Sequence, residues 1–216
     1  MSGYRRFTKD ELREHYFKKY PELLPLSGDI EKAADAVAAC YRGGGTVFCC
    51  GNGGSSADSA HIVGELLKGF LSTRGLDGEQ KERFSRYGEL GNILAEKLQG
   101  SLAAVDLTAQ QAILSAVAND TDPVAMYAQQ LWGLGKKGDV LIGLSTSGNA
   151  KNVLCAGIAA KEKGMFSIAM TGQNGGKMRG LFDVTLGAPS DWTPEVQEYH
   201  IAIYHLLCAL VEAEMF

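Results

Sequence analysis

The sequence lacks the features of several protein classes. It has no excess of positive charge, since 21 lysines and arginines face 25 aspartates and glutamates, for a formal net charge of -4. It has no basic stripe or aromatic ladder that would favour a nucleic-acid partner. No apolar run approaches the roughly 18 residues that span a bilayer, and the first residues lack the apolar core of a signal peptide. We therefore expect a cytoplasmic protein that acts on a small molecule, without nucleic-acid or membrane partners.

Proline is also scarce, and the cysteines form no recognisable motif. The five cysteines are an odd set without a C-x-x-C pair. Cys49 and Cys50 are adjacent in an expected strand, so they should point to opposite faces of a sheet. This usage is typical of reduced, buried thiols and not of a zinc ribbon. With 45% hydrophobic residues and only five prolines, the chain can bury one sizeable core, and we expect a single domain over residues 1–216.

What the sequence does contain is an alternation of short apolar runs with helical patterns. Runs that are apolar on both faces indicate strands covered on both sides. This order predicts an α/β fold with a mostly parallel five-stranded sheet, doubly wound and flavodoxin-like, flanked by helices. The expected strands are TVFCC (46–50), LAAVDL (102–107), VLIGLS (140–145), FSIAM (166–170) and DVTLG (183–187), and the helices between and after them are 55–68, 109–118, 123–134, 149–163 and 193–216.

Capping patterns predict where helices begin. Two helices are expected in an N-terminal segment, residues 8–43. The first starts at the capping box of Thr8 and Glu11, and Asp29 heads the second. Later helix starts, each with a capping side chain followed by proline, are Asp122-Pro123 and Thr193-Pro194.

Residues 71–100 do not fit this alternation. The stretch mixes ten charged residues with glycines and contains no strand-like run. We predict an insertion, which is either a solvated surface excursion or a segment that covers the site or contacts another subunit.

Two loops rich in glycine and hydroxyl residues, GNGGSS (51–56) and STSGN (145–149), follow the first and third expected strands. Ligands of parallel sheets bind at the carboxyl ends of strands, where loops present free N–H groups and the positive end of a helix dipole. Glycine permits close approach and hydroxyls add donors, so the pair predicts a phosphate site without lysine. Ordinary turns capped by serine are the alternative. A dinucleotide site fits less well because GNGGSS lacks the third glycine of that fingerprint.

Titratable residues gather in two distant segments. His61 and Glu65, four apart, share one face of the expected helix 55–68, and Asp58 extends that row. Buried polar groups need partners, because each unpaired group costs about 1–3 kcal/mol. The last helix places four more such groups in an apolar stretch, namely Gln197, Glu198, His200 and His205.

A shared metal site meets a geometric difficulty in the last helix. Gln197 and His205 lie about 12 Å apart along an ideal helix axis and about 80° apart around it. To share one ion they must reach inward, start from a distorted first turn or come from different chains. A surface pair of His61 with Glu65 and a hydrogen-bonded core histidine at position 205 are the alternatives.

Together these residues resemble the sugar isomerase (SIS) domain family and, within it, the phosphoheptose isomerases. The H-x-x-x-E spacing after the glycine loop and the final Q-E-x-H-x-x-x-x-H are the specific parts of the likeness. The matching stretches, which cover most of the chain outside 71–100, are GNGGSSADSAHIVGEL, AND (118–120), GDVLIGLSTSGNAKNV, TGQNGGKM and VQEYHIAIYH.

The resemblance implies an activity and a set of site residues. It implies an aldose–ketose isomerase for a phosphorylated sugar, sedoheptulose 7-phosphate above all, and a homotetramer with sites between subunits. Glu65 would be the base and His205 the acid. The implied Zn²⁺ ligands are His61, Glu65, Gln197 and His205, and the implied phosphosugar contacts are Asn52, Gly53, Gly54, Ser55, Ser56, Asp120, Ser145, Thr146, Ser147 and Gln197.

Some positions depart from the family pattern. Ala150 stands where serine is frequent, Pro194-Glu195 replaces an expected Asp-Arg pair, and Lys68 and Gly69 stand where an arginine is expected. These changes leave the identity of the sugar open. The family also contains non-catalytic phosphosugar sensors and partner-binding scaffolds of the replication-initiator-associating type, which form the alternative. A sensor has no need of acid and base, so the retained histidines and Glu65 favour the enzyme.

Overall fold

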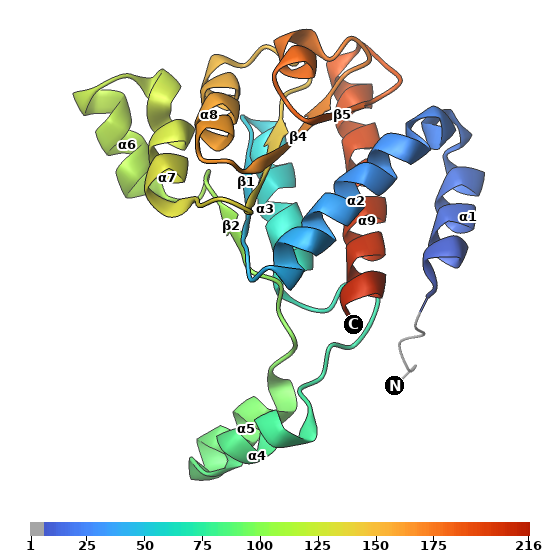
Figure 1. Ribbon diagram of the computed structural model, residues 1–216, viewed down its shortest axis with the longest axis vertical. Helices are drawn as coiled ribbons and strands as arrows, with labels where there is room; N and C mark the ends of the chain where they lie inside the picture. The colour runs from blue at the N-terminus through green and yellow to red at the C-terminus, as the bar shows by residue number, and fades with distance from the viewer. Residues whose placement is uncertain (1–6) are drawn as a thin grey trace.

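A parallel sheet runs through the middle of the molecule in the computed structural model, which describes residues 7–216 (Figure 1). Its five strands follow the order β2-β1-β3-β4-β5, and each pairs in parallel with its neighbours. The α/β, flavodoxin-like prediction is therefore confirmed. The strands are β1 (Val47–Cys50), β2 (Ala104–Asp106), β3 (Val140–Leu144), β4 (Phe166–Thr171) and β5 (Val184–Gly187).

Helices cover both faces of the sheet. The longest of them, α9, packs against α1, α2 and α3, so these four form one side of the molecule. On the other side, α7 packs against α6 and α8. The helices of the first side are α1 (Lys9–Lys19), α2 (Ser27–Arg42), α3 (Gly54–Leu67) and α9 (Thr193–Met215), and those of the second are α6 (Gln111–Asp120), α7 (Met126–Leu134) and α8 (Lys151–Glu162).

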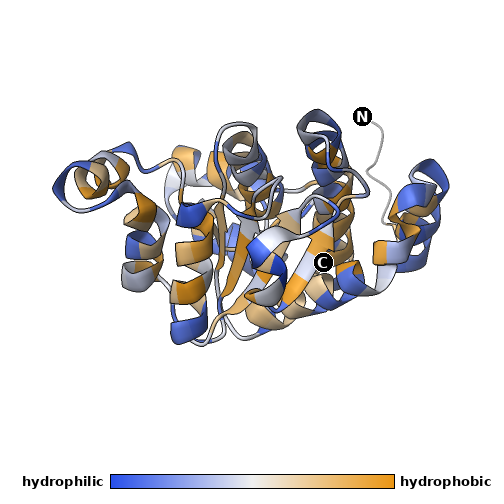
Figure 2. Ribbon diagram, turned by 90° about the horizontal axis from the view of Figure 1, so that it is seen from above, coloured by the Kyte–Doolittle hydropathy of each residue, from blue (hydrophilic) through white to orange (hydrophobic). Residues whose placement is uncertain are grey.

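Strand residues alternate between two hydrophobic cores, as expected for a sheet covered on both faces. Cys49 and Ile142 lie in the core beneath α2, α3 and α9, whereas Cys50 and Leu141 lie in the core beneath α7 and α8. Apolar residues accordingly concentrate between the layers in Figure 2. Both thiols are free, and burial raises the pKa of each, so they stay protonated and unreactive.

Of the four helix starts predicted from capping residues, Thr8 and Asp122 cap their helices as expected, and the other two differ from the prediction. The second helix begins at Ser27 and not at Asp29, because the 3-10 helix Pro21–Leu26 leads directly into it and already supplies a helical turn. Thr193 is the first residue of α9 and caps nothing, since the N-cap is Trp192. The remaining short helices are the 3-10 turns Pro123–Ala125 and Gly176–Gly180.

Residues 71–100 form a helical hairpin that extends away from the sheet (Figure 1). Its helices are α4 (Gly78–Ser85), which starts at a capping box of Asp77 and Gln80, and α5 (Gly88–Lys97). An isolated antiparallel bridge joins Gly75 to Gln99 at its base. No strand of the sheet comes from this segment, but its two helices were not expected. Its status as an insertion stays a prediction, as does the domain range, whose residues 1–6 lie outside the described part.

Within residues 7–216, none of the helices has both the length and the hydropathy that a membrane span requires.

Candidate active site

The two glycine- and serine-rich loops lie side by side at one edge of the sheet. They follow β1 and β3, which are adjacent and pair from Val47 with Val140 to Cys50 with Gly143. The chain turns to opposite sides of the sheet after these two strands, and such a switch point is where open α/β sheets bind ligands. A pocket opens there, lined by Asn52, Gly53, Gly54, Ser55, Leu144, Ser145, Thr146, Ser147, Ala150, Thr193 and Gln197.

Both helices that start at this pocket lack a side-chain cap. The N-cap of α3 is Gly53, with φ 56°, and that of α8 is Ala150. Some first-turn N–H groups are already engaged, since those of Ser55 and Ser56 donate to backbone carbonyl oxygens and that of Val153 donates to Oδ1 of Asn152. What both helix starts present to an anion is the positive end of the helix dipole. Ala150 has no hydroxyl, so it offers no donor to a ligand at the position where serine is frequent. It also cannot cap α8 in competition with a bound anion.

Close packing shapes the second loop. Gly148 donates from its N–H to the carbonyl oxygen of Ser145 at 2.8 Å and has φ 64°, a conformation that favours glycine. A Cβ at this position would overlap the carbonyl oxygen of Gly175, because the TGQNGG turn lies directly against the loop. The hydroxyl of Ser145 is buried and accepts from the N–H of Ala150 at 3.4 Å. The loop is therefore fixed before any ligand binds.

Two residues that sequence reasoning missed hold the first loop. Asn52 and Asn152 exchange side-chain hydrogen bonds of 2.9 and 2.8 Å, which ties the start of α3 to the start of α8. The hydroxyl of Tyr127 lies 2.6 Å from the carbonyl oxygen of Gly51 and 3.1 Å from Oδ1 of Asn52. A buried tyrosine needs a partner for its hydroxyl, but the sequence does not say which one.

Two of the predicted substrate contacts, Ser56 and Asp120, make their hydrogen bonds away from the pocket. Ser56 donates to the hydroxyl of Thr108 at 2.7 Å, beyond the end of β2. Asp120 is exposed at the end of α6 and accepts from the amide of Asn119 at 2.7 Å. Among the described residues, no hydrogen bond joins Asp120 to either loop.

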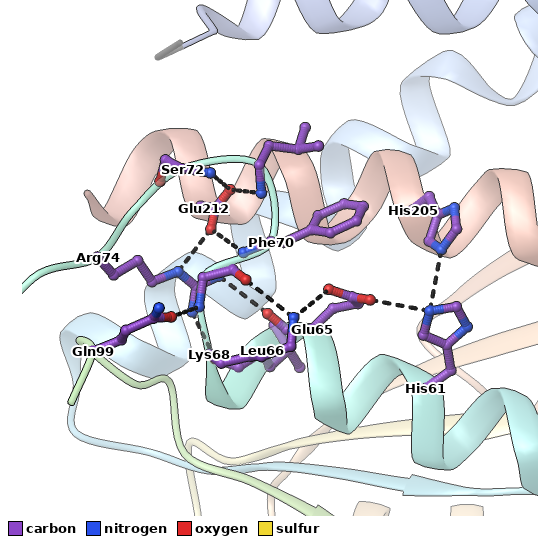
Figure 3. Close-up of polar contacts among 12 residues, drawn as sticks. His61, Glu65, Leu66, Lys68, Phe70, Ser72, Arg74, Gln99, His205 and Glu212 are labelled. Atoms are coloured by element: carbon purple, nitrogen blue, oxygen red, sulfur yellow. Dashed lines mark hydrogen bonds and ion pairs between the residues drawn. The ribbon is translucent and has the colours of Figure 1, made fainter. Parts of the chain in front are cut away.

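A second group of polar side chains gathers farther along α3 and α9. His61, Glu65 and His205 each offer a donor atom, and these atoms all lie within 4.8 Å of one another. Nε2 of His61 lies 3.0 Å from Oε1 of Glu65 and 3.5 Å from Nε2 of His205 (Figure 3). We call these three residues the His/Glu/His group.

This group fits a metal ion by its donors and by one unsatisfied atom. Oε2 of Glu65 is buried and accepts no hydrogen bond, with the ammonium of Lys68 3.7 Å away. Burial, followed by the neighbouring His61, lowers the pKa of His205, so this imidazole is neutral at neutral pH. Neutral imidazole and carboxylate are the forms that bind divalent metals.

Gln197 lies with the loops and not with the His/Glu/His group. A Cβ added to Gly54 would overlap the amide nitrogen of Gln197, which places that amide against the first turn of α3. His205 is two turns farther along the same helix, about 12 Å away along the axis. The role of Gln197 as a metal ligand stays a prediction.

A buried ion pair supports the end of α3 just behind Glu65. Arg74 and Glu212 have side chains that are 0% and 3% exposed, and they lie 2.8 Å apart. Arg74 also donates to the carbonyl oxygens of Leu66 at 2.7 Å and Glu65 at 3.1 Å, and so closes the last turn of the helix (Figure 3). The signal for this pair was Glu212 directly after the apolar run LLCALV (206–211), because a carboxylate buried there demands a partner.

Comparisons with known proteins identify the family of the chain. The family model described as SIS domain matches residues 22–80 and 82–172. Phosphoheptose isomerase of Sulfurimonas denitrificans is 35% identical over 98% of this chain and 97% of its own length, and that of Rhodospirillum rubrum is 42% identical over 85% and 84%. A solved phosphoheptose isomerase structure from Francisella tularensis superposes with a TM-score of 0.73 at 30% identity, covering 95% of this chain and 98% of that one. With its sheet order, its two loops and these matches over most of its length, the chain belongs to the SIS domain family.

Proposed function

We propose that this protein is a phosphosugar isomerase that interconverts a ketose and an aldose phosphate, with sedoheptulose 7-phosphate as its substrate. The proposal is carried by one observation: α3 and α9 contribute both to the hydroxyl-lined pocket and to the His/Glu/His group. The relatives named phosphoheptose isomerase support the seven-carbon substrate.

The spacing of the two parts also favours a long sugar. Gln197 at the pocket and His205 in the group are about 12 Å apart along α9. A phosphate bound at the loops therefore leaves several carbons between itself and the reacting carbonyl end. Shorter sugars would hold the phosphate but fall short of Glu65.

Isomerisation requires a proton to move between neighbouring carbons through an enediol. Glu65 removes the proton from one carbon and returns it to the next. His205, neutral in its partly buried position, is the acid: it donates a proton to the carbonyl oxygen, which becomes a hydroxyl, and takes one back from the neighbouring hydroxyl, which becomes the new carbonyl. The loops hold the phosphate and so fix the reacting carbons beside the carboxylate.

We assign the His/Glu/His group to Zn²⁺, because two imidazole nitrogens and one carboxylate oxygen suit that ion. Gln197 is the proposed fourth ligand, which would require its side chain to leave the loop pocket. Bound zinc would supply a Lewis acid that polarises the sugar oxygens.

A homotetramer with sites between subunits is part of the proposal, as is a cytoplasmic location. Asp120 makes no hydrogen bond to the loops of its own chain among the described residues and does not line their pocket, which favours a contact with the site of a neighbouring subunit. The hairpin of residues 71–100 exposes Tyr87 by 80% and Leu90 by 74%, which favours a subunit contact over a purely solvated excursion.

The test follows solvent deuterium into the sugar. Wild-type protein is incubated in D₂O with ketose phosphates of five to seven carbons, and deuterium at the reacting carbon is measured by NMR. We expect uptake with the seven-carbon substrate, abolished turnover in Glu65→Gln with phosphosugar binding retained, and unchanged turnover in the matched control Glu162→Gln on the exposed end of α8.

Two outcomes would contradict the proposal. Turnover by Glu65→Gln at the wild-type rate removes this carboxylate from the base role. Phosphosugar binding without any deuterium uptake by wild-type protein, with or without added zinc, indicates instead the sensor or scaffold function known from other members of the family.

A further inference from the structure

Two buried side chains beside His61 take no part in the proposed proton transfer. The hydroxyl of Tyr204 lies 2.8 Å from Nδ1 of His61 and 3.4 Å from Oδ1 of Asp58. Tyr204 is 1% exposed and Asp58 8% exposed, and the rings of Tyr204 and His61 meet edge to face with centroids 5.3 Å apart. The three residues therefore form a row that starts from a carboxylate and ends at the His/Glu/His group.

A neutral imidazole has one N–H, so the row has two arrangements. In the first, Nε2 of His61 carries the proton and donates to Glu65, while Nδ1 accepts from Tyr204. Asp58 then accepts no hydrogen bond from Tyr204, because the O–H of Tyr204 points to His61 instead. In the second, Nδ1 carries the proton and donates to the oxygen of Tyr204, whose own O–H turns to Asp58.

Only the second arrangement leaves a lone pair on Nε2, the atom that faces Glu65 and His205. A metal ligand must be unprotonated, so an ion in the group requires this tautomer. The second arrangement also gives the nearly buried carboxylate of Asp58 a donor, which the first withdraws.

We propose that Tyr204 and Asp58 are positioning residues that hold His61 in the metal-binding tautomer and fix the angle of its ring. The inference rests on the proposed metal site and goes beyond it by naming what tunes its affinity. Hydrogen bonds from a ligating histidine to a second group typically change metal affinity by about 10- to 100-fold.

Tyr204→Phe tests the inference, because it removes only the hydroxyl. Zinc affinity is measured by competition with a chromophoric chelator, and we expect it to fall about 10- to 100-fold. Asp58→Asn, which keeps an oxygen but loses the charge, should give a smaller loss. The matched control is Tyr199→Phe on the same helix, whose hydroxyl makes no hydrogen bond to the group, and its zinc affinity should equal that of wild type.

A second readout reports the tautomer directly. Long-range ¹H–¹⁵N NMR spectra of the zinc-loaded wild type should show a proton on Nδ1 of His61. In Tyr204→Phe the Nδ1–H signal should shift or exchange faster with solvent, because its acceptor is gone. Far-UV circular dichroism and the unfolding midpoint check that each variant is folded, so a lost fold is not mistaken for a lost hydrogen bond.

The outcomes separate this inference from the metal site itself. If His61→Ala abolishes zinc binding while Tyr204→Phe and Asp58→Asn bind zinc within twofold of wild type, the positioning role is wrong and the metal site stands. If His61→Ala leaves zinc affinity unchanged, the metal site fails and the inference fails with it. Neither result depends on whether the protein turns over a sugar.

Discussion

Replacing Glu212 by glutamine should destabilise the protein strongly, although the two side chains have the same shape. The carboxylate accepts four hydrogen bonds with two oxygens. Oε1 accepts from the N–H of Phe70 and from Nε of Arg74, both at 2.8 Å, and Oε2 accepts from the N–H groups of Leu71 at 2.7 Å and Ser72 at 3.1 Å. Glutamine has one oxygen, so its NH₂ group would face two of these donors.

The expected loss follows from these four contacts. Two buried donors would remain unsatisfied at about 1–3 kcal/mol each. Arg74, whose side chain is 0% exposed, would also lose its counter-charge, and removing one partner of a buried pair costs about 3–5 kcal/mol. We therefore expect the free energy of unfolding to fall by at least about 3–5 kcal/mol. Glu82→Gln is the matched control, because Glu82 pairs with Arg86 only on the surface, at 3.4 Å, and should cost less than about 1 kcal/mol.

Equilibrium unfolding in urea, followed by circular dichroism, measures both variants. All samples are compared at one protein concentration, since assembly of subunits adds to apparent stability. An unchanged slope with a lower midpoint identifies a true loss of stability. A loss in Glu212→Gln no larger than that in Glu82→Gln would refute the reasoning, because the four contacts would then carry no net free energy.

Three other substitutions test the loops and the core. Gly54→Ala would push the amide of Gln197 aside, and should raise the KM for the phosphosugar by up to about tenfold, the worth of one hydrogen bond, without moving the unfolding midpoint. Gly148→Ala places a methyl group in a backbone conformation with φ 64° and against Gly175, and should lower the free energy of unfolding by at least about 2 kcal/mol in the same urea assay. Burial lowers the pKa of His200 from 6.5 to about 4, so the unfolded chain binds the extra proton and stability rises with pH between those values. His200→Gln should remove on the order of 3 kcal/mol of that pH dependence, measured as unfolding midpoints from pH 4 to pH 7.

The sheet could be predicted because strand burial leaves a direct mark on sequence. Runs such as VLIGL are apolar at every position, and the structure buries every residue of β3. The loops after β1 and β3 could be placed for the same reason, since strand order puts their carboxyl ends together. Helix starts were predicted less well. At Asp29 a local capping pattern competed with a preceding 3-10 helix, and the continuous helical turn prevailed.

Side-chain contacts between residues far apart in the chain could not be predicted from the sequence. Arg74 lies in a charged segment that gives no sign of being buried, and its partner Glu212 is 138 residues away. Tyr204 looks like an ordinary apolar position of α9 until its hydroxyl is seen beside His61. The two helices of residues 71–100 had a usable signal, because Asp77 and Gln80 form a capping box. That signal was masked by the glycines around it.

The distance in sequence between His61 and His205 has a consequence for how the protein is made. During synthesis α3 leaves the ribosome long before α9, with all of β2 to β5 still to be translated between them. The His/Glu/His group therefore cannot form in a nascent chain that lacks α9, and ion binding would stabilise only the complete fold. An ion present at a hundred times its Kd would add about 2.7 kcal/mol to that fold and nothing to a chain without α9. Supply of the ion, for which we propose zinc, should accordingly affect how much full-length protein survives proteolysis in cells, apart from any effect on catalysis.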